Sequence, residues 1–420
     1  MDTGRFITHS LRDSRVLRIL AAAVDAVEPG AAVGRWLESH PLPAAERVFA
    51  LAVGKAASAM LEGLSGSVPL GGALAITKHA PGAFAYPIME GGHPVPDERS
   101  LRAGSSALEL AGRLGPDDLL ICLISGGGSA LMAAPRVPLE DLQTLTRKLL
   151  ASGARIDEIN LLRRHLDRVK GGGLARAANG ARVLSLILSD VMGDPLEAIA
   201  SGPTAPDPTT AVDALDVIAR YGLEAQIPPG IRAALEETVK PGDPVFARVE
   251  NVIIGNNRIA LEATLDRAST EGFHVEPVTE PLEGEARLLG REFARRLRAA
   301  AKRIEGPFCL AAGGETTVTL RGQGRGGRNQ ELALAAAQDL ADAEGVMLIS
   351  LATDGEDGPT DAAGAVATGE TLSRARAAGL DPQAALANND SYPFFEALGD
   401  LIKTGPTGTN VNDLVLLLRV

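Results

Sequence analysis

Short hydrophobic runs alternate along the chain with alanine-rich stretches in which apolar residues recur at helical spacing. The hydrophobic runs are rich in leucine and β-branched residues and cover residues 48–54, 118–125, 181–190, 249–256 and 346–355. This alternation predicts an α/β fold with parallel sheets. The runs are almost continuously apolar, so we expect helices to cover both faces of the sheet.

Two of the intervening segments show the helical spacing clearly, and we interpret their apolar stripes as core positions. The stripes are formed by Leu139, Leu142, Leu145 and Leu149, and by Leu288, Leu289, Phe293 and Leu297. The segment 313–322 (GGETTVTLRG) instead alternates Thr and Val, as a half-exposed antiparallel strand would. A mixed sheet is therefore expected in the later part of the chain.

The length of 420 residues exceeds what one hydrophobic core usually serves, so two domains are expected. The segment 240–244 (KPGDP) combines two prolines, a glycine and charges, and is the best linker candidate. We place the boundary there, giving domains of residues 1–242 and 243–420.

Composition narrows the function classes. Hydrophobic residues make up 45% of the chain and charged residues 22%, as in soluble globular proteins. The net charge of -12, with one Trp and three Tyr, argues against a nucleic-acid-binding surface. The apolar runs are too short for a membrane span and the N-terminus has no apolar signal core, so a cytoplasmic protein is expected.

Cysteine and histidine give little sign of metal or redox chemistry. Cys122 and Cys309 each lie in an apolar run, which predicts buried, reduced side chains. The six histidines are scattered, which argues against a zinc site. His93, in GGHPVPD, is a candidate for lining a cleft, although a structural loop residue is the more common case.

Glycine-rich turns follow the predicted strands, and ligands bind beyond the carboxyl ends of strands in open α/β sheets. Lys55 lies where the first strand gives way to a helix, a position suited to a phosphate oxygen. The turn after the second strand and a later glycine run are further phosphate-binding candidates, although tight βα turns and helix caps explain them almost as well. Their candidate residues are Ser125, Gly126, Gly127, Gly128, Ser129 and Lys170.

The segment 324–331 (GRGGRNQE) leads directly into an apolar helix. Its glycines, including Gly327, let the backbone approach a ligand, while Arg325, Arg328 and Asn329 offer donors beside a helix N-terminus. Such a turn predicts a site for a phosphate or carboxylate. The alternative is a glycine-rich turn with solvated arginines.

Acidic residues stand at two strand ends. Asp190 and Asp354 directly follow apolar runs, where a carboxylate can bind Mg²⁺ or accept a proton from a hydroxyl group. Asp354 is the candidate metal ligand, and Glu315 and Asn410 are candidate polar site residues. Asp194, Asp357 and Asp361 are interpreted as turn formers.

Lysine, arginines, glycine loops and aspartates without a histidine or cysteine constellation favour phosphoryl transfer. The rival is an NAD-dependent reductase, which should show GxGxxG after an early strand. The first turn reads GKAASAM and the second GGGSAL, so neither carries that pattern.

Seven ordered blocks of sequence resemble the class II glycerate 2-kinases, a family described earlier as hydroxypyruvate reductases. The blocks are LAVGKAASAM, LISGGGSALM, EINLLRRHLDRVKGGGLA, LILSDVMGDPLEAIASGPTAPD, GGETTVTLRGQGRGGRNQELALA, LATDGEDGPTDAAGAV and GPTGTNVNDLVLLL. They extend over nearly the whole chain, and the last three lie in a region, about 306–416, that is similar to the MOFRL domain.

The resemblance implies ATP-dependent, in-line phosphorylation of D-glycerate to 2-phosphoglycerate with Mg²⁺ or another divalent cation. It also implies two α/β/α domains, one Rossmann-like and parallel and one mixed, with the active site in the cleft between them. A monomer or homodimer that acts on small molecules alone is expected. The alternatives are an NAD(P)H-dependent hydroxypyruvate reductase and a kinase that forms the 3-phosphate.

The family's important polar positions match six residues, listed here in chain order: Lys55, Asp190, Glu315, Arg328, Asp354 and Asn410. In the mechanism that we expect, Lys55 and Arg328 neutralise the transferring phosphoryl group or anchor the substrate carboxylate, and Asp190 orients or deprotonates the 2-hydroxyl. Glu315 and Asp354 hold metal or ribose, and Asn410 a substrate oxygen. We expect Arg328→Ala to lose almost all turnover with the fold intact.

Overall fold

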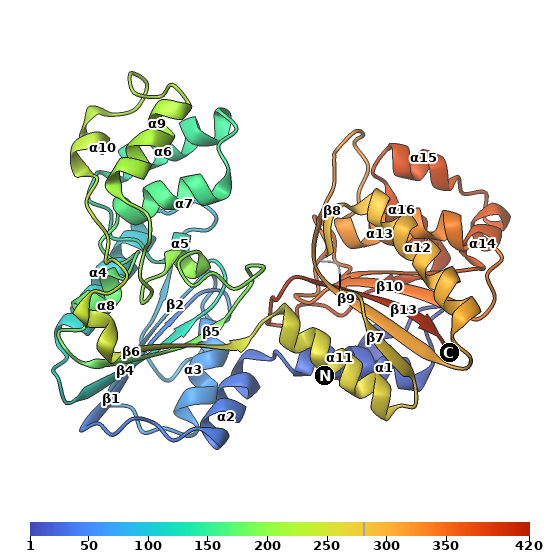
Figure 1. Cartoon of the computed structure of the whole chain (residues 1–420), viewed down its shortest axis with the longest axis horizontal. Coiled ribbons are helices and arrows are strands. Elements are labelled where there is room, and N and C mark those ends of the chain that lie inside the picture. Colours follow the sequence, from blue (N-terminus) through green and yellow to red (C-terminus); the bar gives the residue numbers. More distant parts are fainter. Residues whose placement is uncertain (280–281) are drawn as a thin grey trace. The chain divides into compact units, whose positions relative to one another are not determined.

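The structure, a computed structural model, describes residues 1–279 and 282–420. The chain divides into two compact units, coloured along the sequence in Figure 1. One unit is Pro29–Ile254, and the other combines Met1–Glu28 with Gly255–Val420. We call them the parallel-sheet unit and the mixed-sheet unit.

The parallel-sheet unit contains a six-stranded sheet of order β3-β2-β1-β4-β5-β6. Its strands are β1 (Arg47–Val53), β2 (Gly72–Thr77), β3 (Ile88–Glu90), β4 (Asp118–Ile124), β5 (Arg182–Leu188) and β6 (Val249–Gly255). The pairs β1–β2, β1–β4, β2–β3 and β4–β5 are all parallel. Four of the predicted hydrophobic runs thus form strands, and the predicted Rossmann-like parallel sheet is confirmed.

Helices cover both faces of this sheet (Figure 1). The helices are α2 (Pro29–Ser39), α3 (Ala57–Ser65), α4 (Glu98–Gly112), α5 (Gly128–Leu131) and α8 (Gly173–Ala177). Leu51 and Val53 pack with residues of α4 and α8. Because side chains alternate along a strand, Ala50 and Ala52 point to the opposite face, where α3 contacts β1.

A separate group of helices has its own hydrophobic core within this unit. It consists of α6 (Leu139–Ala151), α7 (Ile156–His165), α9 (Ala211–Arg220) and α10 (Pro229–Ala234). Leu142, Leu145 and Leu149 are buried in this core, as the helical spacing predicts. A short 3-10 helix, η2 (Ile199–Ser201), contacts both α5 and α7.

The mixed-sheet unit contains a seven-stranded sheet of order β12-β11-β10-β13-β9-β7, and β8 also pairs with β9. Its strands are β7 (His274–Pro277), β8 (Leu282–Glu285), β9 (Phe308–Thr317), β10 (Val346–Ala352), β11 (Gly364–Thr368), β12 (Leu401–Ile402) and β13 (Asp413–Arg419). β9 is antiparallel to β13 but parallel to β7 and β8. The predicted mixed sheet is confirmed, although Glu315–Thr317 of the alternating segment pair in parallel with β8.

Helices α12 (Ala286–Arg303) and α13 (Arg328–Leu340) pack together on one face of the mixed sheet, and α11 (Asn257–Thr270) covers the other with α1 (Ser14–Asp25) beside it (Figure 1). The smaller helices α14 (Thr371–Ala377), α15 (Pro382–Ala387) and α16 (Ser391–Leu398) complete this unit. Phe293 and Leu297 of α12 are buried as predicted, but Leu288 is 66% exposed. Leu288 is wrongly placed in the predicted stripe because it lies one residue, or about 100°, from Leu289 around the helix.

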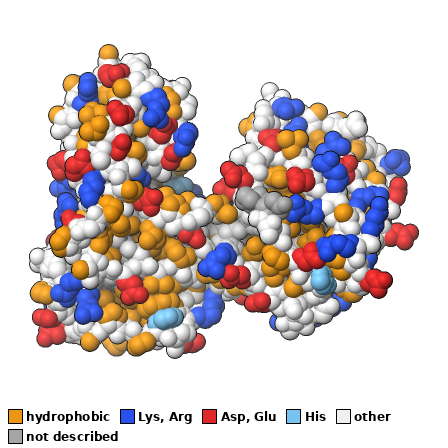
Figure 2. All heavy atoms as spheres, in the orientation of Figure 1, with side chains coloured by type: hydrophobic (Ala, Val, Ile, Leu, Met, Phe, Trp, Pro, Cys, Tyr) orange, Lys and Arg blue, Asp and Glu red, His pale blue; other side chains and the backbone are white. Residues whose placement is uncertain are grey.

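Charged side chains of both signs are interspersed over the surface of the mixed-sheet unit (Figure 2). Several arginines of α12 pair with carboxylates, for example Arg291 with Asp339 and Arg303 with Glu276. The basic composition of α12 therefore reflects a solvated surface with matching acids.

The boundaries between the two compact units fall after residues 28 and 254, whereas the sequence predicts one boundary after residue 242. Residues 243–254 stay with the parallel-sheet unit because β6 joins its sheet beside β5. The first 28 residues belong to the mixed-sheet unit because α1 packs on α11, where Arg18 pairs with Glu271. Within 1–279 and 282–420, no helix is long and apolar enough to cross a membrane.

Candidate functional site

The order of the parallel sheet marks the place where a ligand is expected. β2 and β3 lie on one side of β1, and β4, β5 and β6 lie on its other side. The order in which the chain adds strands to the sheet therefore changes direction between β1 and β4. Ligands of open α/β sheets bind at such a reversal, beyond the carboxyl ends of the strands. The turns after β1 and β4 meet here: Lys55 N donates to Gly126 O at 2.9 Å, and Ala56 N donates to Ser125 Oγ at 3.1 Å.

Close backbone approach explains the glycines of these turns. An added Cβ on Gly54, which has a φ of +122°, would lie 2.2 Å from Ser125 Oγ. An added Cβ on Gly126 would lie 2.1 Å from Oδ2 of Asp190, at the end of β5. The structure thus places the Asp190 carboxylate directly against the turn after β4, and only glycine leaves room for it there.

Two side chains complete this corner of the parallel-sheet unit. Lys55 is exposed, and its ammonium group makes no hydrogen bond or ion pair with the described part of the chain. The His93 imidazole lies against Gly127, with Nε2 3.3 Å from an added Cβ. Burial, and then the charges of Lys55 and Lys78, lower the pKa of His93 and favour the neutral ring. His93 thus lies beside the turn after β4, and its role as a cleft residue stays a prediction.

The remaining predicted residues of this unit have contacts within the protein. Gly128 packs tightly on Ala200, 2.7 Å from an added Cβ to the alanine Cβ, and Ser129 Oγ lies 2.6 Å from Ser201 Oγ. Lys170 is buried, and its Nζ donates to Met132 O and Asp167 Oδ2, both at 2.9 Å. The ammonium group of Lys170 therefore already has two acceptors within the protein, and its role in ligand binding stays a prediction.

Arg328 is the first residue of α13, and its guanidinium forms a bidentate ion pair with the buried carboxylate of Asp413. Its Nε and Nη2 donate to the two carboxylate oxygens of Asp413 at 2.5 and 2.9 Å, and its Nη1 lies 2.7 Å from Glu315 Oε1. The Asp413 side chain is fully buried, whereas those of Arg328 and Glu315 are 30% and 46% exposed. Arg328 thus connects a buried carboxylate to an accessible one.

The N-terminus of α13 already carries a carboxylate. Asp357 accepts hydrogen bonds from Asn329 N at 3.1 Å and Gln330 N at 2.9 Å. An added Cβ on Gly327 would lie 2.2 Å from Asp357 Cγ. The sequence predicts an external anion at this helix start, but its N–H groups already have the Asp357 carboxyl group as acceptor. Asp357 is therefore a helix cap as well as a turn residue.

The glycine-rich segment before α13 also donates to protein acceptors. Backbone N–H groups of residues 322–325 bond to the segment 388–390, with distances of 3.1 Å to Asn389 Oδ1 and 2.8 Å to Asp390 Oδ1 among them. The Arg325 guanidinium stacks 4.1 Å from the centre of the Tyr392 ring. These contacts fit the alternative interpretation, in which the segment is a packed turn.

The pKa values of the two buried carboxylates near Arg328, those of Asp357 and Asp413, are shifted mainly by burial. Burial raises the pKa of Asp357 to about 7, and the neighbouring Asp413 adds to the shift. Burial raises the pKa of Asp413 to about 6 despite Arg328, and Glu315 adds to that shift. Burial alone would lower the pKa of Arg328, but the hydrogen bonds and charge of Asp413 raise it.

The other predicted residues of this unit border the same cluster. Asn329 is buried and accepts a hydrogen bond from Ser350 Oγ at 2.6 Å. Asn410 Oδ1 accepts from Asn412 N at 3.1 Å, and Asn412 Nδ2 donates to Glu315 Oε2 at 3.0 Å. Glu315, Arg328 and Asn410 are thus linked through Asn412 and Asp413, two residues that sequence reasoning did not select.

Asp354 follows β10 and is half-buried, and its Oδ1 accepts a hydrogen bond from Glu356 N at 3.1 Å. Over residues 1–279 and 282–420, no three His, Cys, Asp or Glu side chains group closely enough to hold a metal by themselves. Mg²⁺ usually takes one or two protein carboxylates and completes its shell with phosphates and water. The single carboxylate of Asp354 fits such a ligand.

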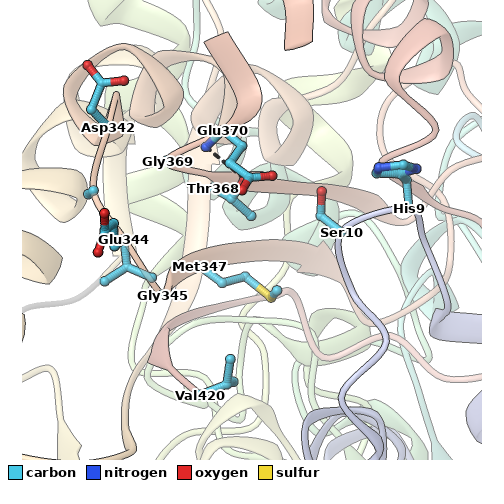
Figure 3. Close-up of a pocket in the computed structure, with 12 residues that line it drawn as sticks. His9, Ser10, Asp342, Glu344, Gly345, Met347, Thr368, Gly369, Glu370 and Val420 are labelled. Carbon is cyan, nitrogen blue, oxygen red and sulfur yellow. Dashed lines mark hydrogen bonds between the residues drawn. The ribbon is translucent and has the colours of Figure 1, made fainter. Parts of the chain in front are cut away.

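An open cavity of about 670 Å³ lies elsewhere in the mixed-sheet unit (Figure 3). Its walls include His9, Ser10, Glu344, Met347 and Glu370. Met347 is near the start of the seven-residue strand β10, whereas Asp354 follows the end, so the two ends are about 20 Å apart. The cavity therefore lies away from the polar cluster around Arg328.

Comparison with known proteins adds independent evidence. Residues 15–236 match a domain of unknown function (DUF4147), and residues 308–413 match the MOFRL family. The chain is 43% identical to a D-glycerate 2-kinase of Thermotoga maritima, over 96% of this chain and 97% of that protein. It is also 43% identical to an Agrobacterium vitis protein named as a hydroxypyruvate reductase, and the match covers 96% of this chain and 93% of that protein. A crystal structure of glycerate kinase from Thermotoga maritima superposes with a TM-score of 0.90, at 42% identity, covering 96% of this chain and 98% of that one.

Proposed function

The chain belongs to the glycerate 2-kinase family with a C-terminal MOFRL domain, and we propose that it transfers the γ-phosphoryl group of ATP to the 2-hydroxyl of D-glycerate. One observation carries the proposal beyond the family resemblance. The turns after β1 and β4 meet where the sheet reverses direction, and Asp190 and the unpaired Lys55 lie in these turns or against them.

Phosphoryl transfer depends mainly on positioning and on neutralising charge, and each group at this corner fits one of these tasks. The accessible ammonium of Lys55 neutralises charge on the transferring phosphoryl group. Backbone N–H groups of Gly126 and Gly127 approach phosphate oxygens, because neither residue has a side chain to block them. The Asp190 carboxylate orients the 2-hydroxyl and accepts its proton as the new O–P bond forms and the bond between the γ-phosphorus and the bridging oxygen breaks, which releases ADP.

The Arg328 cluster has a positioning role in this proposal. Arg328 holds Glu315, whose carboxylate is 46% exposed and can accept hydrogen bonds from the nucleotide ribose. Asn410 is linked to Glu315 through Asn412 and binds a substrate oxygen. Asp354 would hold Mg²⁺, which offsets negative charge on the phosphates when bound.

A reductase is the second candidate function, since the similar Agrobacterium vitis protein carries that name. The turn after β1 reads GKAASAM and lacks the three glycines of a dinucleotide-binding turn. A reductase should oxidise NADH with hydroxypyruvate and without ATP. A kinase should release ADP only when glycerate is present, so one coupled assay on the purified protein separates the two.

Lys55→Ala tests the proposed site directly. Loss of a charge that stabilises the transition state should lower kcat by about a hundredfold or more. Lys148→Ala is the matched control, because Lys148 is an exposed lysine on α6. Wild-type turnover in Lys55→Ala, with full glycerate-dependent ADP release, would remove Lys55 from the site.

A further inference from the structure

Three cations of the parallel-sheet unit, Arg163, Arg164 and Lys170, lie within eight residues of sequence, and they differ in whether an acidic side chain pairs with them. Arg164 Nε donates to Asp207 Oδ2, and Lys170 Nζ donates to Asp167 Oδ2, each at 2.9 Å. Arg163 has no carboxylate partner in 1–279 or 282–420. Its Nη1 donates to the amide oxygen of Asn160 at 3.4 Å, and its buried Nε has no hydrogen-bond partner among the described residues.

Arg163 borders the candidate site. It lines a small cavity together with Ser129, Asp167, Lys170, Pro96 and Leu142. Ser129 follows Gly128 in the turn after β4, and its hydroxyl is paired with that of Ser201 in η2, which contacts α7. The enclosed volume of about 10 Å³ is roughly enough for one water molecule. This void is too small for a carboxylate, and the inner edge of the guanidinium beside it is desolvated. Arg163 and Ser129 are each half-buried, so a ligand would meet them from the solvent side.

A desolvated cation without a counter-anion costs free energy, and proteins normally match it with an acid. Arg164 and Lys170 follow this rule, a few residues away from Arg163. Burial lowers the pKa of Arg163, as expected for a charge that lacks compensation. Such an arrangement is explained when a bound anion supplies the missing charge.

We propose that Arg163, assisted by the hydroxyl of Ser129, is the anchor for the carboxylate of the acceptor substrate. This inference rests on the proposed function, in which the acceptor is a 2-hydroxy acid. A planar guanidinium pairs with a carboxylate through two parallel hydrogen bonds. The acceptor's carboxylate and reacting hydroxyl are on adjacent carbons. The anchor must therefore lie near Asp190, and Ser129 is three residues from Gly126, on which Asp190 packs.

Lys170 lines the same cavity but is already paired with Asp167, so Arg163 is the cation left to meet a ligand. One guanidinium suits a small monoanion better than a triphosphate, which needs several cations. Arg163 then determines specificity for acids over neutral diols. D-glyceramide, in which an uncharged amide replaces the carboxylate, is the matching probe.

The test compares Arg163→Met with Arg168→Met, an exposed arginine five residues further along. Loss of a charged hydrogen-bonded pair should raise the KM for D-glycerate by about 10- to 100-fold in Arg163→Met. The KM for ATP should stay within about twofold of wild type, given that the nucleotide makes no contact with this residue. The preference for glycerate over glyceramide in kcat/KM should fall by a similar factor, and Arg168→Met should match wild type.

Thermal unfolding without ligand gives an independent reading. Removing an uncompensated cation should leave the Tm of Arg163→Met at or above that of wild type, whereas a structural arginine would lower it when replaced. If Arg163→Met does not fold, the structural role is supported and the anchor is overturned. An increase in the KM for ATP alone, or unchanged constants for both substrates, would also overturn it.

Binding of D-glycerate without nucleotide separates failure of the anchor from failure of the proposed function. Glycerate should raise the Tm of wild type but not of Arg163→Met. If wild type binds glycerate in this way yet never phosphorylates it, the kinase proposal fails and the anchor stands. If wild type phosphorylates glycerate and Arg163→Met binds it equally well, the anchor alone fails.

Discussion

Arg328→Ala should destabilise the protein strongly at neutral pH and only weakly in mild acid. Arg328 is the counter-charge of Asp413, whose side chain is fully buried. Removal of the guanidinium leaves that carboxylate without compensation. This revises the sequence-based expectation that the variant keeps an intact fold.

The magnitude follows from the burial of the two partners. Breaking a buried ion pair by removing one partner costs about 3–5 kcal/mol. The Arg328 side chain is 30% exposed, so we expect a loss of about 3 kcal/mol in the free energy of unfolding at pH 7.5. At pH 5, Asp413, with a pKa raised to about 6, is largely protonated even in the wild type. Only the exposed contact with Glu315 is then lost, which is worth about 1 kcal/mol or less.

Urea unfolding of wild type, Arg328→Ala, Asp413→Asn and the double variant at both pH values measures these differences. At pH 7.5 the double variant should be about as stable as Asp413→Asn alone, because the carboxylate that Arg328 compensates is then absent. A loss for Arg328→Ala that is equal at pH 5 and pH 7.5, or no rescue by Asp413→Asn, would refute the reasoning. The folded double variant also isolates catalysis: wild-type turnover in it would exclude Arg328 from the site.

Two further outcomes follow from the same contacts. Asp357 has a folded pKa raised to about 7 from 3.8, so it binds a proton more readily when folded, and its contribution to stability is lost as pH rises from about 4 to 7. Asp357→Asn should remove that loss, so urea unfolding should show the variant gaining on wild type between pH 5 and pH 8. An unchanged difference would contradict the shift. Gly126→Ala should lower kcat far more than the free energy of unfolding, because the added Cβ would lie 2.1 Å from Asp190 Oδ2. Gly34→Ala is the control: Gly34 has open space around it, so this variant should match wild type in the same ADP-release assay. Equal kcat in both alanine variants would count against a role for Asp190.

The strands and their covering helices could be predicted because hydrophobic pattern and glycine turns are local signals. The residues after β1 and β4 were found for the same reason: parallel strands bring their carboxyl ends to one edge. That rule was enough to predict that Asp190 and Lys55 lie at the same edge of the sheet, without any information on long-range contacts.

The turn before α13 shows what local signals miss. Its glycines and arginines look like an anion site, but the acceptors that occupy its N–H groups are Asn388, Asn389 and Asp390, more than 60 residues away. The carboxylate at the helix start comes from Asp357, which the sequence marks only as a turn residue. Nothing in the sequence pairs these segments.

Arg163 and Arg164 illustrate the same limit at neighbouring positions. Both belong to one basic helix, and the sequence treats them alike. Within residues 1–279 and 282–420, Arg164 pairs with Asp207, whereas Arg163 has no acidic partner. The separate role that we propose for Arg163 rests on this difference.

The product of the reaction tests the central claim most directly. Purified protein is incubated with ATP, Mg²⁺ and D-glycerate, and proton-coupled ³¹P NMR of the new phosphate ester is recorded. Transfer to the 2-hydroxyl predicts a doublet, since the phosphorus couples to the single proton on the second carbon. A triplet would show the 3-phosphate, and the absence of any ester, with hydroxypyruvate-dependent NADH oxidation instead, would contradict the kinase proposal altogether.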